Sequence, residues 1–152
     1  MMIPKNRFVI DTNIIISRLL KPASIPGKAF QKAFSMGTIL ISEEVLQELM
    51  DVLWRKKFDP YLTIEDRQDF LRHLSFNAQI IPYVIPIRAC RDPKDDKILS
   101  LAISGYANII LTGDNDLLVL DPFQNIRILT CLAYVQEDFS LGGEPRMLKL
   151  IN

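Results

Sequence analysis

The chain has 152 residues, with 18 basic side chains, 18 acidic side chains and one histidine. This length fits a single domain with its own core, and 49% apolar with 24% charged residues is typical of a globular protein. Zero net charge argues against a basic surface that binds nucleic acid non-specifically. A single histidine excludes zinc sites with paired histidines and two-histidine acid–base mechanisms. The chemistry that remains is carboxylate chemistry.

Three features of the sequence predict a cytoplasmic protein without a membrane segment. The two cysteines, Cys90 and Cys131, form no CxxC pair and are too few for a disulfide framework, which indicates a reducing compartment. The apolar stretch Phe8–Ile10 is too short for a signal peptide. The longest uncharged run, Ile98–Gly113, is too short and too polar to cross a bilayer.

The first half of the chain is predicted to alternate strands with helices. Strands are expected at residues 7–10 and 39–41, and helices at 14–20, at 26–36, after Ser42 and after Thr63. Pro22 ends the first of these helices. Ser42 caps the third, and Thr63 with Asp66 resembles the capping box of the fourth.

The second half continues this alternation. An extended segment is expected at 79–87, helices at 93–104 and 133–138, and strands at 108–111 and 127–129. Pro82 and Pro86 make the extended segment an edge strand or a loop. Strands that alternate with helices predict one α/β domain over residues 1–152, with a parallel sheet covered on both faces. In such sheets the ligand site lies at the carboxyl ends of the strands.

Two isolated acids are candidate ligands. Asp11 ends the first predicted strand, where it is either a helix cap or a metal ligand. Glu48 lies on the third helix, about 40° outside an apolar arc of about 120°. A glutamate at such a boundary is usually a solvated rim residue, so its significance depends on other acids nearby.

Three acids crowd the start of the helix at 93–104. Capping and the helix dipole account for Asp92 and for Asp95, three residues later. Asp96 is left over. It shares a helix face with Leu99 and Ser100, which predicts that its carboxylate lies beside the apolar seam and forms part of a site.

The segment Thr112–Asp116 follows the most apolar strand and contains Asp114 and Asp116. It is either a polar turn or a source of further ligands beside Asp11. Four acidic segments that converge are costly unless a positive ion lies between them. Oxygen ligands favour Mg²⁺ or Mn²⁺, and one or two such ions suit phosphodiester hydrolysis by an activated water.

These segments resemble the PIN-domain family, which includes VapC-type toxins of toxin–antitoxin systems. The matching segments are Val9–Asn13, Ser42–Leu49, Asp92–Lys97 and Leu111–Leu118. The resemblance covers residues 7–138 and leaves the tail, 139–152, unassigned. It implies a three-layer α/β/α domain with a central parallel sheet of four to five strands.

The resemblance also implies an activity: metal-dependent cleavage of single-stranded RNA, with Mg²⁺ or Mn²⁺ as cofactor. Its acidic positions fall on Asp11, Glu48, Asp96 and Asp114, with Asp116 as an auxiliary ligand. Four further residues have supporting roles: the acid Asp95 and the polar residues Thr12, Asn13 and Thr112. Which acid of Asp95/Asp96 and of Asp114/Asp116 is the ligand stays open. The family further implies a cognate antitoxin partner and a homodimer or higher oligomer.

Other charged residues have simpler interpretations. His73 is expected to be structural. Arg55, Lys56 and Lys57 close the third helix, where they are either dipole partners or contacts for RNA phosphates. Candidate RNA-binding cations are Arg18, Lys21, Arg91 and Lys94. The alternative to a nuclease is a non-catalytic module of the same fold that binds RNA or protein and uses its acids only as helix caps.

Overall fold

The computed structural model describes residues 5–138 and 146–147. Its central sheet has five strands, β1 (Asn6–Ile10), β2 (Gly37–Ile41), β3 (Gln79–Ile80), β4 (Ile109–Leu111) and β5 (Arg127–Leu129). They lie in the order β3-β2-β1-β4-β5, and every neighbouring pair is parallel. The predicted α/β class with a parallel sheet is confirmed. A separate antiparallel pair joins β6 (Glu137–Asp138) to β7 (Arg146–Met147); the rest of the unassigned tail lies outside the described residues.

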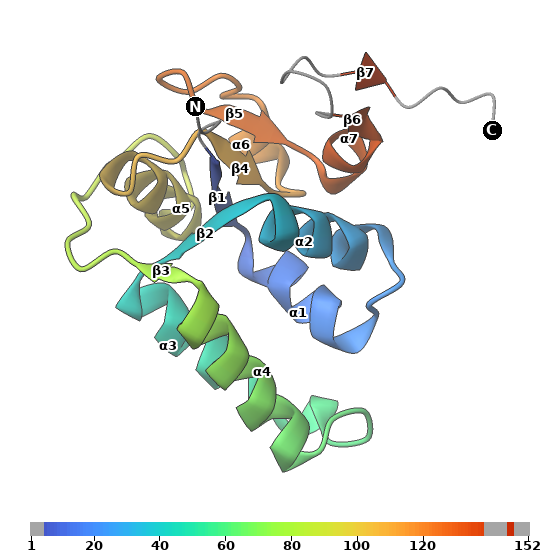
Figure 1. Ribbon diagram of the computed structural model, residues 1–152. Helices are drawn as coiled ribbons and strands as arrows, with labels where there is room; N and C mark the ends of the chain where they lie inside the picture. The colour runs from blue at the N-terminus through green and yellow to red at the C-terminus, as the bar shows by residue number, and fades with distance from the viewer. Residues whose placement is uncertain (1–4, 139–145, 148–152) are drawn as a thin grey trace.

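Seven helices accompany the strands in the described part of the chain. They are α1 (Thr12–Leu20), α2 (Ile25–Met36), α3 (Glu43–Leu53), α4 (Ile64–Asn77), α5 (Pro93–Ser104), α6 (Asn115–Leu118) and α7 (Cys131–Gln136), with a 3₁₀ turn, η1 (Lys56–Phe58), after α3. Helices α1, α2 and α7 lie on one side of the sheet and α5 on the other, while α3 and α4 extend from the β3 edge (Figure 1). No helix within the described residues is both long and apolar enough to span a membrane.

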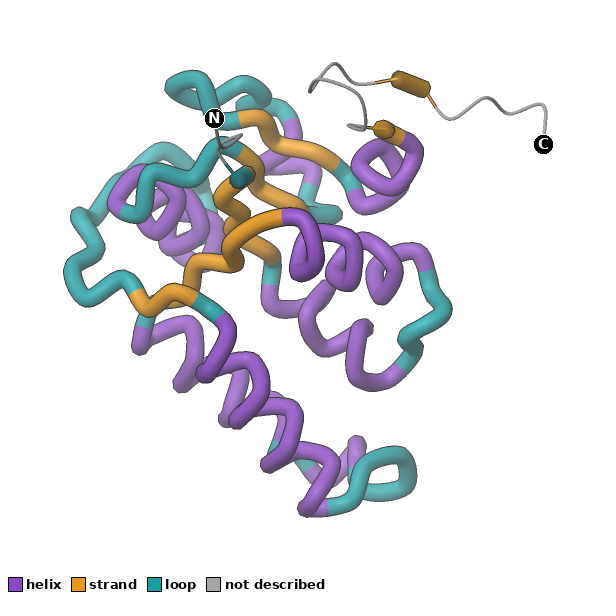
Figure 2. Tube along the Cα trace, in the orientation of Figure 1, coloured by secondary structure: helices purple, strands orange, loops and turns teal. Residues whose placement is uncertain are grey.

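Local chemistry explains most element boundaries. Ser42 caps α3 by accepting a hydrogen bond from the Val45 N–H, and Thr63 with Asp66 forms the full capping box of α4. The segment with Pro82 and Pro86 forms a strand only at Gln79–Ile80, on the sheet edge, and then continues as a loop (Figure 2). The sequence did not predict α6, because its four residues are too few to show helical periodicity.

The core is formed by the strands and the inner faces of the helices. Phe8 on β1 is fully buried and packs edge-on against Tyr134 of α7, with ring centroids 5.4 Å apart. On the other face, Leu99 and Ala102 of α5 are also fully buried. The sheet is therefore covered on both faces.

Gly37, at the start of β2, permits the close approach of β1. A Cβ atom at this position would lie 2.6 Å from the Phe8 ring and closer still to the Asn6 carbonyl oxygen. We expect Gly37→Ala to lower the free energy of unfolding by about 1–3 kcal/mol, because β1 must move to relieve this overpacking. Urea denaturation measures the change.

Gly113 is the matched control for this substitution. A Cβ atom added there would have no other atom within 4 Å, so Gly113→Ala should change the unfolding free energy by less than about 0.5 kcal/mol. Equal effects of the two substitutions would show that the β1–β2 approach does not require glycine.

Candidate active site

The candidate site lies at the carboxyl ends of β1 and β4. These strands pair with Ile10 opposite Leu111, and the Asp11 N–H donates to the Leu111 carbonyl at 2.9 Å. The order in which the chain adds strands reverses here, since β2 lies on one side of β1 and β4 on the other. Such a switch point leaves a crevice between the loops that follow the strands. Asp11 stands at its base.

The Thr112 hydroxyl connects the two strand ends. It is fully buried, donates to Asp11 Oδ2 at 2.9 Å and accepts from the Asp114 N–H at 3.1 Å. Asp11 Oδ1 also accepts from the Asn13 N–H, and Asp114 Oδ1 from the Asp116 N–H. Both acids are therefore helix caps, of α1 and α6, and both also line the cleft. The two interpretations offered by the sequence are compatible.

Asp95 is the most unusual acid of the site. Only 4% of its surface is exposed, and its Oδ2 accepts no hydrogen bond from any described residue. Burial, the adjacent Asp114 carboxyl group and the charges of Asp92 and Asp11 raise the pKa of Asp95 from 3.8 to about 6. An ionised, buried carboxylate without a donor is costly, so this position favours a proton or a cation beside it.

The surrounding donors fit an oxygen-preferring divalent cation. Carboxylate oxygens of Asp95, Asp114 and Asp116 lie within 4.8 Å of one another, and such oxygens suit Mg²⁺ or Mn²⁺. Burial and the charges of Asp96, Asp95 and Asp116 also raise the pKa of the nearby Cys90 thiol to about 11, so this thiol is protonated at neutral pH in the metal-free protein.

Asp96 points to a different part of the molecule. Its Oδ1 accepts the backbone N–H groups of Ala89 and Cys90, both at 2.8 Å, and these bonds lower the pKa of Asp96. It does not line the cleft that contains Asp95. Of the two neighbouring acids, Asp95 lines the cleft and Asp96 faces away from it.

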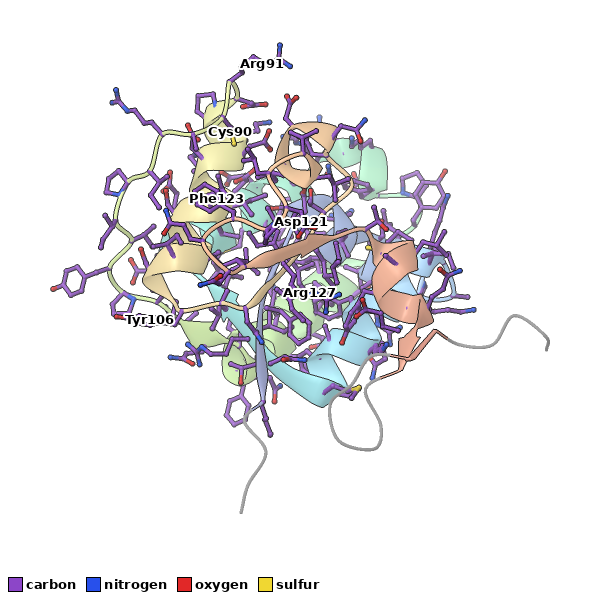
Figure 3. The ribbon with its side chains drawn as sticks, turned by 90° about the horizontal axis from the view of Figure 1, so that it is seen from above. Cys90, Arg91, Tyr106, Asp121, Phe123 and Arg127 are labelled. Carbon is purple, nitrogen blue, oxygen red and sulfur yellow. The ribbon has the colours of Figure 1, made fainter. Side chains whose placement is uncertain are left out.

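The segment held by Asp96 is a strap, residues 81–92, that runs along α5 (Figure 3). Ser100 Oγ accepts from the Ile87 N–H at 2.9 Å, and Ser104 Oγ from the Ile85 N–H at 2.7 Å. Four helical residues rise about 6 Å, and two extended residues span about 6.6 Å. Asp96, Ser100 and Ser104 are spaced one helical turn apart on α5. They therefore match the N–H groups of every second residue of the strap, Ala89, Ile87 and Ile85.

The wall of the cleft opposite α5 is helix α3. Glu44, Glu48 and Asp51 all line the cleft, and Glu44 forms an ion pair with Lys97 of α5 at 3.0 Å. Glu48 is half-buried, as its boundary position predicts. Glu44 and Asp51 were not predicted from the sequence. Their spacing from Glu48, four residues before and three after, places all three on one helix face and would have indicated them.

The complete cleft has a volume of about 870 Å³. Seven carboxylates line it: Asp11, Glu44, Glu48, Asp51, Asp92, Asp95 and Asp114. Four cations line it as well: Arg55, Lys57, Lys94 and Lys97. Thr12 and Asn13 also contribute to the wall. The cleft therefore brings together the predicted Asp11, Glu48, Asp95 and Asp114 with the polar residues that follow β1, whereas the predicted Asp96 and Asp116 do not line it.

Among the predicted RNA-binding cations, Lys94 lines the cleft. Arg91 lies at the end of the strap, projects outward and pairs with Asp116 at 3.1 Å (Figure 3). Arg18 and Lys21 are not among the residues that line the cleft; the Arg18 guanidinium contacts the Pro22 carbonyl instead.

The segments that form this site match a known protein family. The PIN-domain family model matches residues 7–116, which include both strand ends, α3 and α5. The chain belongs to the PIN-domain family. The uncharacterized protein MJ1680 of Methanocaldococcus jannaschii is 34% identical to this PIN domain over 120 residues, or 76% of each chain.

Two solved structures share the PIN fold. VapBC2 from Rickettsia felis, bound to a DNA fragment from its promoter, matches with a TM-score of 0.55 and 18% identity, over 82% of this chain and 98% of that one. PAE2754 from Pyrobaculum aerophilum also has a TM-score of 0.55, with 13% identity over 86% and 88%. The resemblance and the three-layer fold predicted from the sequence are confirmed.

The raised pKa of Asp95 predicts a pH-dependent stability of the metal-free protein. The folded state binds this proton more tightly than the unfolded state, so the contribution of Asp95 to the free energy of unfolding should fall as pH rises from about 4 through about 6, by at most about 3 kcal/mol relative to Asp95→Asn. Asp95→Asn cannot lose a proton and should be more stable than wild type at pH 7 in EDTA. Thermal melting across this pH range measures both effects.

Asp96→Asn is the control, because its pKa is shifted in the opposite direction. This variant should be less stable than wild type at pH 7, since the charge-assisted bonds to the strap weaken. A destabilised Asp95→Asn at pH 7 would contradict the strain assigned to Asp95.

Proposed function

We propose that this PIN domain is a metal-dependent endoribonuclease that cleaves single-stranded RNA, and that it is the toxin of a toxin–antitoxin system. The buried, unpartnered carboxylate oxygen of Asp95 beside Asp114 carries the proposal. A protein that used these acids only as caps would gain nothing from burying Asp95 among three other carboxyl groups. A cation-binding site accounts for that arrangement.

The proposed ligands are Asp11, Asp95, Asp114 and Asp116, which hold one or two Mg²⁺ or Mn²⁺ ions. Asp95 takes the role that the sequence pattern predicted for Asp96, because the Asp96 carboxylate is occupied by the strap. The bound metal would supply a Lewis acid for the scissile phosphate and the attacking water. Thr112 fixes the Asp11 carboxylate through its hydroxyl hydrogen bond.

The other cleft residues have roles in the hydrolysis. Glu48, on the α3 wall, is the proposed acceptor of the proton that the attacking water loses. The water oxygen forms a bond to phosphorus as the bond to the leaving oxygen breaks, and that oxygen takes up a proton. Lys94, which lines the same cleft, offers positive charge to the phosphate.

The biological assignment rests on the family and on one structural neighbour. The structural neighbour is VapBC2 bound to a DNA fragment from its promoter. Together with the VapC-type toxins of the family, it supports a cognate antitoxin as partner of this chain. We extend the proposal to a homodimer or higher oligomer that acts in the cytoplasm. Co-purification with the product of an adjacent gene would identify the antitoxin.

A metal site should be visible as ligand-dependent stability. We expect the melting temperature to rise with Mn²⁺, because each tenfold increase of free metal above its dissociation constant adds about 1.4 kcal/mol. Asp95→Asn should abolish this rise, and Asp96→Asn should keep it. Differential scanning calorimetry at several Mn²⁺ concentrations is the measurement. No rise for wild type at millimolar metal would favour the non-catalytic module instead.

Cleavage itself is tested with purified protein and a labelled single-stranded RNA in Mn²⁺. We expect Asp11→Asn to reduce the rate by about 10²-fold or more, since it removes a charged ligand at the reacting centre. Asp121→Asn is the matched control, because Asp121 does not line the cleft and its carboxylate accepts from the Ile128 N–H instead. Equal rates for wild type and Asp11→Asn would assign the activity to a contaminant.

A further inference from the structure

The cleft does not end at its acids. Arg55 and Lys57, which follow α3, also line it, and Lys56 between them does not. Arg55 follows Trp54, the C-cap of α3, and its own backbone is extended, so it lies just beyond the helix that carries Glu44, Glu48 and Asp51. The charge along this wall therefore changes from negative to positive.

These two cations share the cleft with seven carboxylates. Among the described residues, neither Arg55 nor Lys57 forms an ion pair, whereas Lys97 pairs with Glu44. The nearest cleft acid in sequence, Asp51, instead accepts a hydrogen bond from Gln47 at 2.9 Å. Lys94, on the α5 side, is likewise exposed and in no ion pair within the described residues. An acid-rich cleft that leaves exposed cations unpaired has positive charge available for an external anion.

The position of Lys57 is defined by an aromatic ring. Its ammonium group lies 5.1 Å from the ring centroid of Phe58, which also lines the cleft. A cation–π contact of this kind holds the charge against the wall without neutralising it. The helix dipole alone would be served equally by Lys56, so it does not explain why the two flanking cations face the cleft.

We propose that Arg55 and Lys57 bind RNA phosphates next to the bond that is cut. This inference rests on the proposed nuclease function and adds a substrate subsite to it. A single strand lying in the cleft would place one phosphate at the acids, where a cation neutralises it, and a neighbouring phosphate at Arg55 and Lys57. An acidic protein segment fits less well, because the seven carboxylates of the same cleft would repel it.

The subsite also explains how a protein without net positive charge could attract RNA. A protein of zero net charge has no general positive field to attract RNA. Two unpaired cations inside the cleft supply that attraction locally, close to the reacting centre. In this proposal Arg55 and Lys57 hold the RNA strand and also determine which of its phosphates lies at the acids.

The test is a binding measurement with a fluorescein-labelled oligouridylate in Mg²⁺, made in an Asp11→Asn background that prevents cleavage. Fluorescence anisotropy gives the affinity at several salt concentrations. We expect Arg55→Ala and Lys57→Ala each to weaken binding several-fold and to reduce the slope of log affinity against log salt by about 0.7, the value for one lost single-strand phosphate contact. Lys56→Ala, the matched control, should leave both unchanged.

Two results would overturn the subsite. If all three alanine variants weaken binding equally, the attraction is general and not located in the cleft. If Arg55→Ala and Lys57→Ala bind like the Asp11→Asn parent, RNA does not pass this part of the cleft.

Failure of the nuclease proposal would look different. The wild-type chain would show neither Mn²⁺ stabilisation nor cleavage, whatever the outcome at Arg55 and Lys57. In the wild-type background, Arg55→Ala and Lys57→Ala should retain the full Mn²⁺-dependent rise in melting temperature, because neither residue contacts the proposed ligands.

Discussion

The site depends on one buried hydroxyl group. Thr112 donates to the Asp11 carboxylate and accepts from the backbone of Asp114, so a single side chain fixes the ends of β1 and β4 relative to each other. The parallel register brings these ends together, and Thr112 sets the orientation of the acids on them. Valine would fill the same space but could form neither bond. The geometry of the acidic cluster is therefore a property of the sheet edge rather than of mobile loops.

The same cluster opposes folding. Asp95 is buried beside Asp114 with an oxygen that has no donor among the described residues, and its raised pKa reflects that strain. Helix dipoles offset part of the cost, because Asp11 and Asp92 cap α1 and α5 and Asp95 lies in the first turn of α5. The PIN domain thus accepts a local loss of stability at the place where a cation would restore it. This is a common relation between stability and function.

The sequence predicted the fold because its signals are local. Prolines, caps and apolar runs located four strands of the sheet and every helix except α6, which is too short to be periodic. The segment that contains β3 was left as an edge strand or a loop, and the structure has both. The sequence predicted which segments contribute to the site, but it did not predict which of Asp95 and Asp96 faces the cleft. Asp96 does share a helix face with Ser100, as expected, yet that face meets the strap and not the cleft. Helical phase shows which residues point together; only tertiary packing shows what they point toward.

The strap along α5 has a further consequence for how this chain can change. By its backbone it is a loop, and loops usually tolerate insertions and deletions. Here alternate N–H groups, at Ile85, Ile87 and Ala89, meet acceptors spaced one helical turn apart. One added residue would turn the following donors to the opposite side and leave their acceptors unfilled. The length of this irregular segment is therefore as constrained as that of a strand in a sheet, and homologous chains should differ here by substitution rather than by length.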